Sequence, residues 1–146
     1  MTSSIFKMFG TDVAREKTGV WNDYGDIRFL VARAGGSNIA FSEAYKAKVR
    51  PFRHQIDRGT LSKTDDDNIM AELYAETVIK SVEIKDDKAM WVRGLPTPNG
   101  EVVSYSVAGV KQLLLELPDL FRDIRECATD TQKYLKEAEE ADAKNS

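Results

Sequence analysis

Apolar residues recur every three or four positions in four stretches of this 146-residue chain, and this spacing constrains the fold more than any other feature. It places apolar side chains along one face of an α-helix, and that face must pack against another element. The stretches cover roughly residues 37–59, 64–82, 106–117 and 118–135, and they predict about four helices around a shared core. The core residues that we expect from these faces are Leu73, Val78, Leu114, Leu117, Phe121 and Ile124.

Pro51 lies inside the first of these stretches. Proline removes a backbone hydrogen bond and usually ends or kinks a helix. The apolar residues on both sides of it keep one helical phase: Phe41, Tyr45, Val49, Phe52 and Ile56. We therefore predict a kinked helix that continues to Gly59.

Strand-forming residues are concentrated in two regions. Residues 20–31 contain two runs of them on either side of the turn-rich sequence NDYGD, which predicts a β-hairpin. A possible second short hairpin lies near 88–105, where residues 90–92 and 102–104 flank a loop rich in proline and glycine. The predicted fold class is thus mainly α with a small N-terminal β-hairpin (α+β). We expect one globular domain over 1–135 and a polar, mobile tail over 136–146.

The chain carries few residues suited to catalysis. Gly35 and Gly36 stand between a predicted strand and a predicted helix, but the surrounding ARAGGSN lacks the spacing of a phosphate-binding loop, so we interpret them as a tight turn. His54 is the only histidine and lies in a basic run; Cys127 is the only cysteine and lies on an apolar helix face. One histidine and one cysteine are too few for a typical transition-metal site and disfavour a nucleophilic pair. We expect no enzymatic activity, cofactor or metal.

A basic run and a following acidic cluster are the remaining candidates for a site. The basic residues are Lys46, Lys48, Arg50, Arg53, His54 and Arg58, and the acidic ones are Asp65, Asp66 and Asp67. The aspartates lack the spacing of a calcium loop and suit the start of a helix. A solvated helix face is the simplest interpretation of the basic run. The alternatives are a charged seam with another copy or a partner, and a nucleic-acid site, which the net charge of −3 disfavours.

The predicted hairpin offers a second surface for self-association. Its strand edge is one that another chain could pair with. We therefore add Trp21 and Tyr24 to the candidate residues.

Five segments in order resemble the tail assembly chaperones of long-tailed (siphovirus-type) bacteriophages. They are GVWNDYG, ARAGGSN, RPFRHQIDRGTL, AETVI and LLLELPDLF, and the resemblance covers roughly residues 7–135. The stretch 84–106 is longer than the pattern leads one to expect, and the tail after Leu135 lies outside it.

This resemblance implies a non-enzymatic assembly factor in the host cytoplasm. Such a chaperone binds the tape measure protein, keeps it soluble and helps to recruit tail tube subunits, the last through a longer form made by ribosomal frameshifting. The resemblance also implies a homo-oligomer that is absent from the mature virion and binds neither nucleic acid nor membrane. Two alternatives remain: a permanent tail completion or connector protein, and a small nucleic-acid-binding regulator that uses the basic run.

Overall fold

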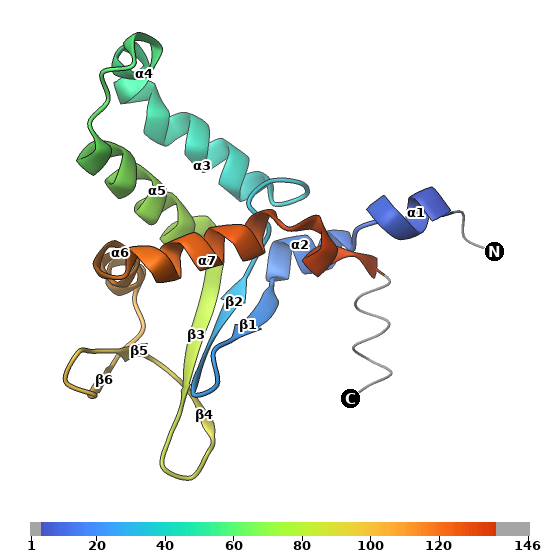
Figure 1. Cartoon of the computed structure of the whole chain (residues 1–146), viewed down its shortest axis with the longest axis vertical. Helices are drawn as coiled ribbons and strands as arrows, with labels where there is room; N and C mark the ends of the chain where they lie inside the picture. The colour runs from blue at the N-terminus through green and yellow to red at the C-terminus, as the bar shows by residue number, and fades with distance from the viewer. Residues whose placement is uncertain (1–3, 137–146) are drawn as a thin grey trace.

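The protein is described here by a computed structural model over residues 4–136. Its centre is an antiparallel sheet with the strand order β1-β2-β3-β4. The strands are β1 (Val20–Asp23), β2 (Ile27–Val31), β3 (Ile79–Lys85) and β4 (Trp91–Arg93). Two shorter strands, β5 (Leu95–Pro96) and β6 (Val102–Val103), form a separate ribbon beside it (Figure 1).

The helices next to this sheet form two groups. Three of them form an arm that projects away from the sheet: α3 (Ile39–Val49), α4 (Arg53–Arg58) and α5 (Lys63–Thr77), with the 3-10 turn η1 (Arg50–Phe52) between the first two (Figure 1). Two others, α6 (Val107–Glu116) and α7 (Pro118–Thr129), pack against the sheet and the base of α5. The short helices α1 (Ser4–Phe9) and α2 (Val13–Thr18) precede β1, and the 3-10 turn η2 (Thr131–Tyr134) follows α7.

The core lies where the sheet, α5, α6 and α7 meet. Phe29 on β2, Leu114 on α6 and Ile124 on α7 are almost completely buried there. The buried Tyr134 packs at one end of this core, and its hydroxyl donates a hydrogen bond of 3.0 Å to the carbonyl of Val31. Burying this phenol therefore leaves no unsatisfied polar group.

The predicted fold class is wrong. The described residues form a four-stranded sheet, a second two-stranded ribbon and more helices than the four predicted, so the protein is α+β with a larger β component. The N-terminal hairpin exists, with β1 and β2 paired from Val20–Val31 to Asp23–Arg28, but it is half of that sheet.

The main error concerns β3. The spacing of Val78 and Val82 predicts a helix to about residue 82, but α5 ends at Thr77 and the chain becomes a strand. A separation of four fits both structures, because i and i+4 also share one face of a strand. A bulge adds to the ambiguity. Leu30 pairs with Ser81 and Val31 with Ile79, so the buried residues Ile79 and Val82 are three apart, as on a helix.

The second hairpin is also paired differently from the prediction. Residues 91–93 pair with β3, whereas Val102 and Val103 pair with Pro96 and Leu95. Gly94 separates the two pairings, and a Cβ there would lie 2.6 Å from a methyl group of Val102. A side chain at Gly94 would therefore force Val102 on β6 to move.

Two predictions about the helices have opposite outcomes. The kink at Pro51 is confirmed, because α3 passes through η1 into α4 without leaving a helical path. The burial of Leu117 is wrong, since its side chain is 46% exposed. It lies between α6 and α7 with φ −123° and ψ 75°, so it departs from the face that both helices bury. The other five predicted core residues are buried.

The predicted tail begins at the last described residue, Lys136, and residues 137–146 lie outside the described part of the chain. Over residues 4–136, no helix has the length and apolar character required to span a bilayer.

Candidate partner-binding surfaces

The first candidate surface is a groove along the arm, between α3–α4 and α5. It has a volume of about 440 Å³, and we call it the arm groove. Its lining residues are mostly apolar and come from both sides of the arm: Tyr45, Val49, Ile56, Gly59, Leu61, Lys63, Asp66, Ile69 and Met70. Tyr45 and Ile56 remain 43% and 39% exposed. The apolar face predicted over residues 41–56 is thus only partly covered by its own chain.

Local sequence explains why the arm stays open. Pro51 replaces one α-helical turn by the 3-10 turn η1, which redirects α4. Gly59 then ends α4 in the left-handed conformation, with φ 68°. Ser62 begins α5 by accepting a hydrogen bond of 3.1 Å from the backbone N–H of Asp65.

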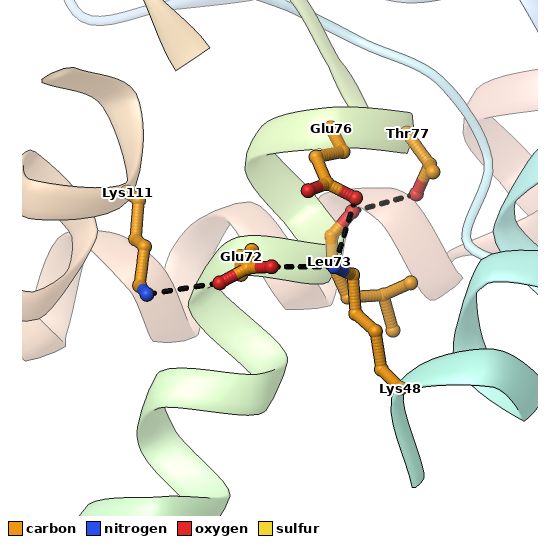
Figure 2. Close-up of polar contacts among 6 residues, drawn as sticks. All are labelled: Lys48, Glu72, Leu73, Glu76, Thr77 and Lys111. Carbon is orange, nitrogen blue, oxygen red and sulfur yellow. Dashed lines mark hydrogen bonds and ion pairs between the residues drawn. The ribbon is translucent and has the colours of Figure 1, made fainter. Parts of the chain in front are cut away.

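A polar cluster fixes the base of the arm (Figure 2). The Lys48 ammonium on α3 lies 2.7 Å from a carboxylate oxygen of Glu72 and 2.9 Å from one of Glu76, both on α5. Lys111 on α6 binds the other oxygen of Glu72 at 3.0 Å. The hydrogen bonds from Lys48 and Lys111 lower the pKa of Glu72 to about 2. Glu72 therefore joins three helices, although its side chain is 42% exposed and water screens these pairs.

Four of the five arginine and lysine candidates lie on the outer surface of the arm. Lys46, Arg50, Arg53 and Arg58 are all exposed, and none of them has an ion pair with another of the residues 4–136. Lys48 is the exception in the basic run, because Glu72 and Glu76 use its charge within the chain.

The acidic candidates lie on the neighbouring helix of the same arm. Asp65 and Asp66 occupy the first turn of α5, where the helix dipole favours negative charge. Asp67 pairs with Lys63 at 2.8 Å. The structure thus places the basic and acidic residues on adjacent helices of one chain, and a seam between copies stays a prediction.

The two hairpin candidates have separate environments. Trp21 is 42% exposed on the sheet, where the Arg28 guanidinium stacks between the Trp21 and Trp91 rings at 4.0 and 4.3 Å. Tyr24 donates a hydrogen bond to the Asp123 carboxylate on α7. Burial and this carboxylate raise the pKa of Tyr24. Tyr24 therefore ties the hairpin to the helices. The Trp21–Arg28–Trp91 stack escaped the sequence reasoning because it depends on the strand order.

The turn at Gly35 and Gly36 is filled by a carboxylate of the chain itself. Glu16 is 1% exposed, accepts a hydrogen bond of 2.5 Å from the backbone N–H of Ser37 and lies 3.3 Å from Arg33. Burial opposes its ionisation, but the hydrogen bond from Ser37 and the charge of Arg33 outweigh burial, and the pKa of Glu16 is lowered. Gly36 has φ +52°, and a Cβ there would lie 2.2 Å from the Glu16 carboxylate. The place where such a turn could hold a phosphate is therefore occupied.

The structure keeps the two nucleophile candidates apart. Cys127 is buried on α7, and burial raises the pKa of its thiol, whereas His54 is exposed on α4 in the arm. In the part of the chain that the structure describes, no three His, Cys, Asp or Glu side chains are grouped so that they could hold a metal ion.

A second groove, which sequence reasoning missed, lies between the sheet and the corner of α6 and α7. It has a volume of about 330 Å³ and continues into a neighbouring hollow of about 210 Å³; we call the two together the sheet groove. Pro96, Leu113 and Leu117 line both parts. Asp26 and Glu116 are the charged residues of its lining, and both are acidic. No local sequence pattern indicated this groove, since the helical spacing assigned Leu117 to the core.

Helix α1 is a third unassigned feature. None of its residues is buried, and four apolar side chains are between 56% and 68% exposed: Ile5, Phe6, Met8 and Phe9. So many large apolar groups on one short helix form a surface that a partner is expected to cover.

Comparisons with known proteins agree with a phage origin. The family model described as YdaY prophage protein matches residues 35–145, which include the arm, β3 to β6, α6 and α7. No curated protein and no solved structure matches the chain. Because the match covers most of the sequence, the chain belongs to the YdaY prophage protein family and is a protein of phage origin.

Proposed function

We propose that this prophage protein is a tail assembly chaperone that binds the tape measure protein through the arm groove and keeps it soluble. The observation that carries the proposal is the arm groove itself, a groove with apolar walls and a charged end, on the projecting helical arm. The phage origin of the family supports the setting in which such a factor acts.

The groove suits an amphipathic helix. A client helix lays apolar residues at i, i+3, i+4 and i+7 into such a channel. Tyr45 and Ile56 are already partly exposed on its walls, so little of the chaperone's own packing has to be given up. At the tip of the arm, Lys63 and Asp66 line the same groove and offer one charge of each sign to orient the client.

The finer parts of the proposal come from the resemblance to tail assembly chaperones. A longer, frameshifted form would recruit tail tube subunits. The protein would act without catalysis or cofactor in the host cytoplasm and leave before the virion matures.

Co-expression with the tape measure protein of the same prophage tests the proposal. The wild-type chain should raise the soluble yield of the client and co-purify with it. Ile56→Gln removes an apolar wall of the groove and keeps a good helix former. Loss of one buried contact of this size should weaken binding by roughly tenfold, from about 1.5 kcal/mol. Ile39→Gln is the matched control, because Ile39 begins α3, is 61% exposed and does not line the groove.

Three results would contradict the proposal. Equal client binding by the Ile56→Gln and Ile39→Gln variants would exclude the arm groove. Retention of the protein in purified virions would favour the permanent tail component. Retention on DNA that weakens steeply with salt, without client binding, would favour the regulator.

A further inference from the structure

Helix α1 projects from the rest of residues 4–136, and none of its residues is buried (Figure 1). Ile5, Met8 and Phe9 share one face by their spacing, and Phe6 lies beside them. Lys7 is the single charged residue of the helix. The apolar surface is therefore continuous and faces solvent in the isolated chain.

In this structure α1 starts from an anchored segment and packs none of its residues into the core. The segment that follows it is held by three backbone contacts to the C-terminal part of the fold. Asp12 donates to the carbonyl of Tyr134 at 2.9 Å, Lys136 donates to that of Gly10 at 3.1 Å, and Thr11 forms a bridge with Leu135. From this anchored base α1 points away, on the opposite side of the molecule from α6 and β5 (Figure 1). Within residues 4–136, α1 thus leaves its apolar surface open to another molecule.

The sheet groove has the properties of that partner. It is apolar, it lies on the far side of the fold from α1, and the two charged residues of its lining, Asp26 and Glu116, oppose the positive charge of Lys7. The arm groove is a poorer match, because its lining includes the cation Lys63 beside Asp66, whereas the charged residues that line the sheet groove are both acidic. Residues 137–146 are a poorer occupant, since their sequence EAEEADAKNS is acidic and has no apolar residue larger than alanine.

We propose that α1 of one copy docks in the sheet groove of a second copy. The two surfaces differ, so the contact is heterologous: each copy offers one helix and one groove. Repetition of this contact builds a chain of copies that either closes into a ring or continues as a spiral. The proposal concerns self-association and holds whatever the client of the arm groove is.

The expected contact is modest. Four side chains that are 56% to 68% exposed offer on the order of 400–500 Å², given the size of phenylalanine and similar groups. Doubled for the groove side, the area is roughly 800–1,000 Å², which is below the roughly 1,200 Å² of stable specific interfaces and in the range of weak, transient ones. Self-association should therefore be reversible and depend on concentration in the micromolar range.

Two variants remove one surface each. The double variant Phe6→Gln, Phe9→Gln alters only exposed residues of α1 and so leaves the core intact. Leu117→Asp places a charge in the sheet groove, and because Leu117 is the N-cap of α7, aspartate is a favoured residue there. Matched controls are Val13→Gln at the start of α2 and Val107→Asp at the start of α6; both residues are exposed and neither lies in the groove.

Sedimentation velocity over a hundredfold concentration range is the measurement. The wild type and both controls should form species larger than a monomer, and each surface variant alone should stay monomeric. Mixing the two surface variants should restore a dimer, because one supplies an intact groove and the other an intact α1. This restoration is required if the contact is heterologous. The dimer should not grow further, because each of its copies has lost one of the two surfaces.

The remaining outcomes would overturn the proposal. A monomeric wild type at about 100 μM would do so at once. Loss of assembly in the α1 variant but not in Leu117→Asp would place α1 in another groove. Failure of the mixture to form a dimer, with both variants folded by circular dichroism, would show that the two surfaces do not meet. Loss of client binding in the α1 variant without a change in sedimentation would make α1 a client contact instead.

Discussion

Replacing Phe121 by alanine is the most direct test of where the core lies. Phe121 is 6% exposed on α7, and its ring lies edge-to-face with Tyr74 on α5, with centroids 5.3 Å apart at 75°. The Arg125 guanidinium covers the ring at 4.5 Å from the centroid. The side chain thus connects the base of the arm with α7.

The cost of the substitution follows from these contacts. Truncating a buried phenylalanine typically lowers the free energy of unfolding by about 3–5 kcal/mol, through lost burial and the cavity left behind. The aromatic pair with Tyr74 accounts for about 0.5–1.5 kcal/mol of that sum. Since Phe121 is nearly fully buried, we expect a loss of about 4 kcal/mol. For a chain of this length, that lowers the melting temperature by roughly 8–16 °C.

Leu117→Ala provides the comparison. The helical patterns of two successive helices predict Leu117 and Phe121 alike as core residues, but Leu117 is 46% exposed and its loss should cost less than about 1 kcal/mol. Urea unfolding followed by circular dichroism should be done at low protein concentration, so that self-association adds nothing to stability. A loss below about 1 kcal/mol for Phe121→Ala, or equal losses for both variants with unchanged m-values, would refute this account of the core.

Three further predictions follow from single sites. Gly36→Ala should lower the free energy of unfolding by about 1–3 kcal/mol, and by more than Gly25→Ala does. Both glycines have positive φ, but only at Gly36 would a Cβ meet the Glu16 carboxylate. Thermal unfolding of the two variants measures the difference. The folded-state pKa of Glu72 lies below its unfolded value of 4.5, so its contribution is present above that pH and lost as the pH falls toward 2. Glu72→Gln should therefore destabilise the protein by about 1 kcal/mol at pH 7, after allowance for solvent screening, and flatten the acid limb of a stability–pH curve. Deleting residues 137–146 should leave the melting temperature unchanged, because that sequence offers no large apolar group to bury.

The sequence predicts the helices well where the apolar spacing can mean only one structure. α6 and α7 are separated at Pro118, as predicted, and the helical path through Pro51 is kept. It fails at β3, where a spacing of four is shared by a helix and a strand and a bulge shifts the buried positions. Strand pairing in 88–105 fails because short strands gain their register from tertiary contacts, here the burial of Leu95.

The candidate surfaces were predictable to a different degree. The apolar face over residues 41–56 is visible in the sequence, but only the structure shows that α5 leaves part of it open. The role of Lys48 was hidden, since its partners Glu72 and Glu76 are more than twenty residues away. The sheet groove needs β2, β5, α6 and α7 together, so no local pattern could reveal it. The sequence shows that the basic run is positively charged. It does not show that Lys48 forms ion pairs within the chain while the other arginines and lysines of the run form none with residues 4–136.

The two proposed contacts would act together if both hold. The Lys48–Glu72–Lys111 cluster fastens α3 and α5 to α6, and α6 lines the sheet groove. The arm therefore has a fixed orientation relative to the surface that receives α1. In a head-to-tail assembly, the operation that relates one copy to the next also relates their arm grooves, so these grooves would recur at one spacing along the chain of copies. A long helical client could then bind several grooves at once, and weak single contacts would add up to tight binding through effective concentration.

Accordingly, Leu117→Asp should weaken binding to the full-length tape measure protein by ten- to a hundredfold. The same variant should bind a single client helix as well as the wild type does, because the arm groove itself is unchanged. Equal loss of both affinities would mean that the sheet groove contacts the client directly.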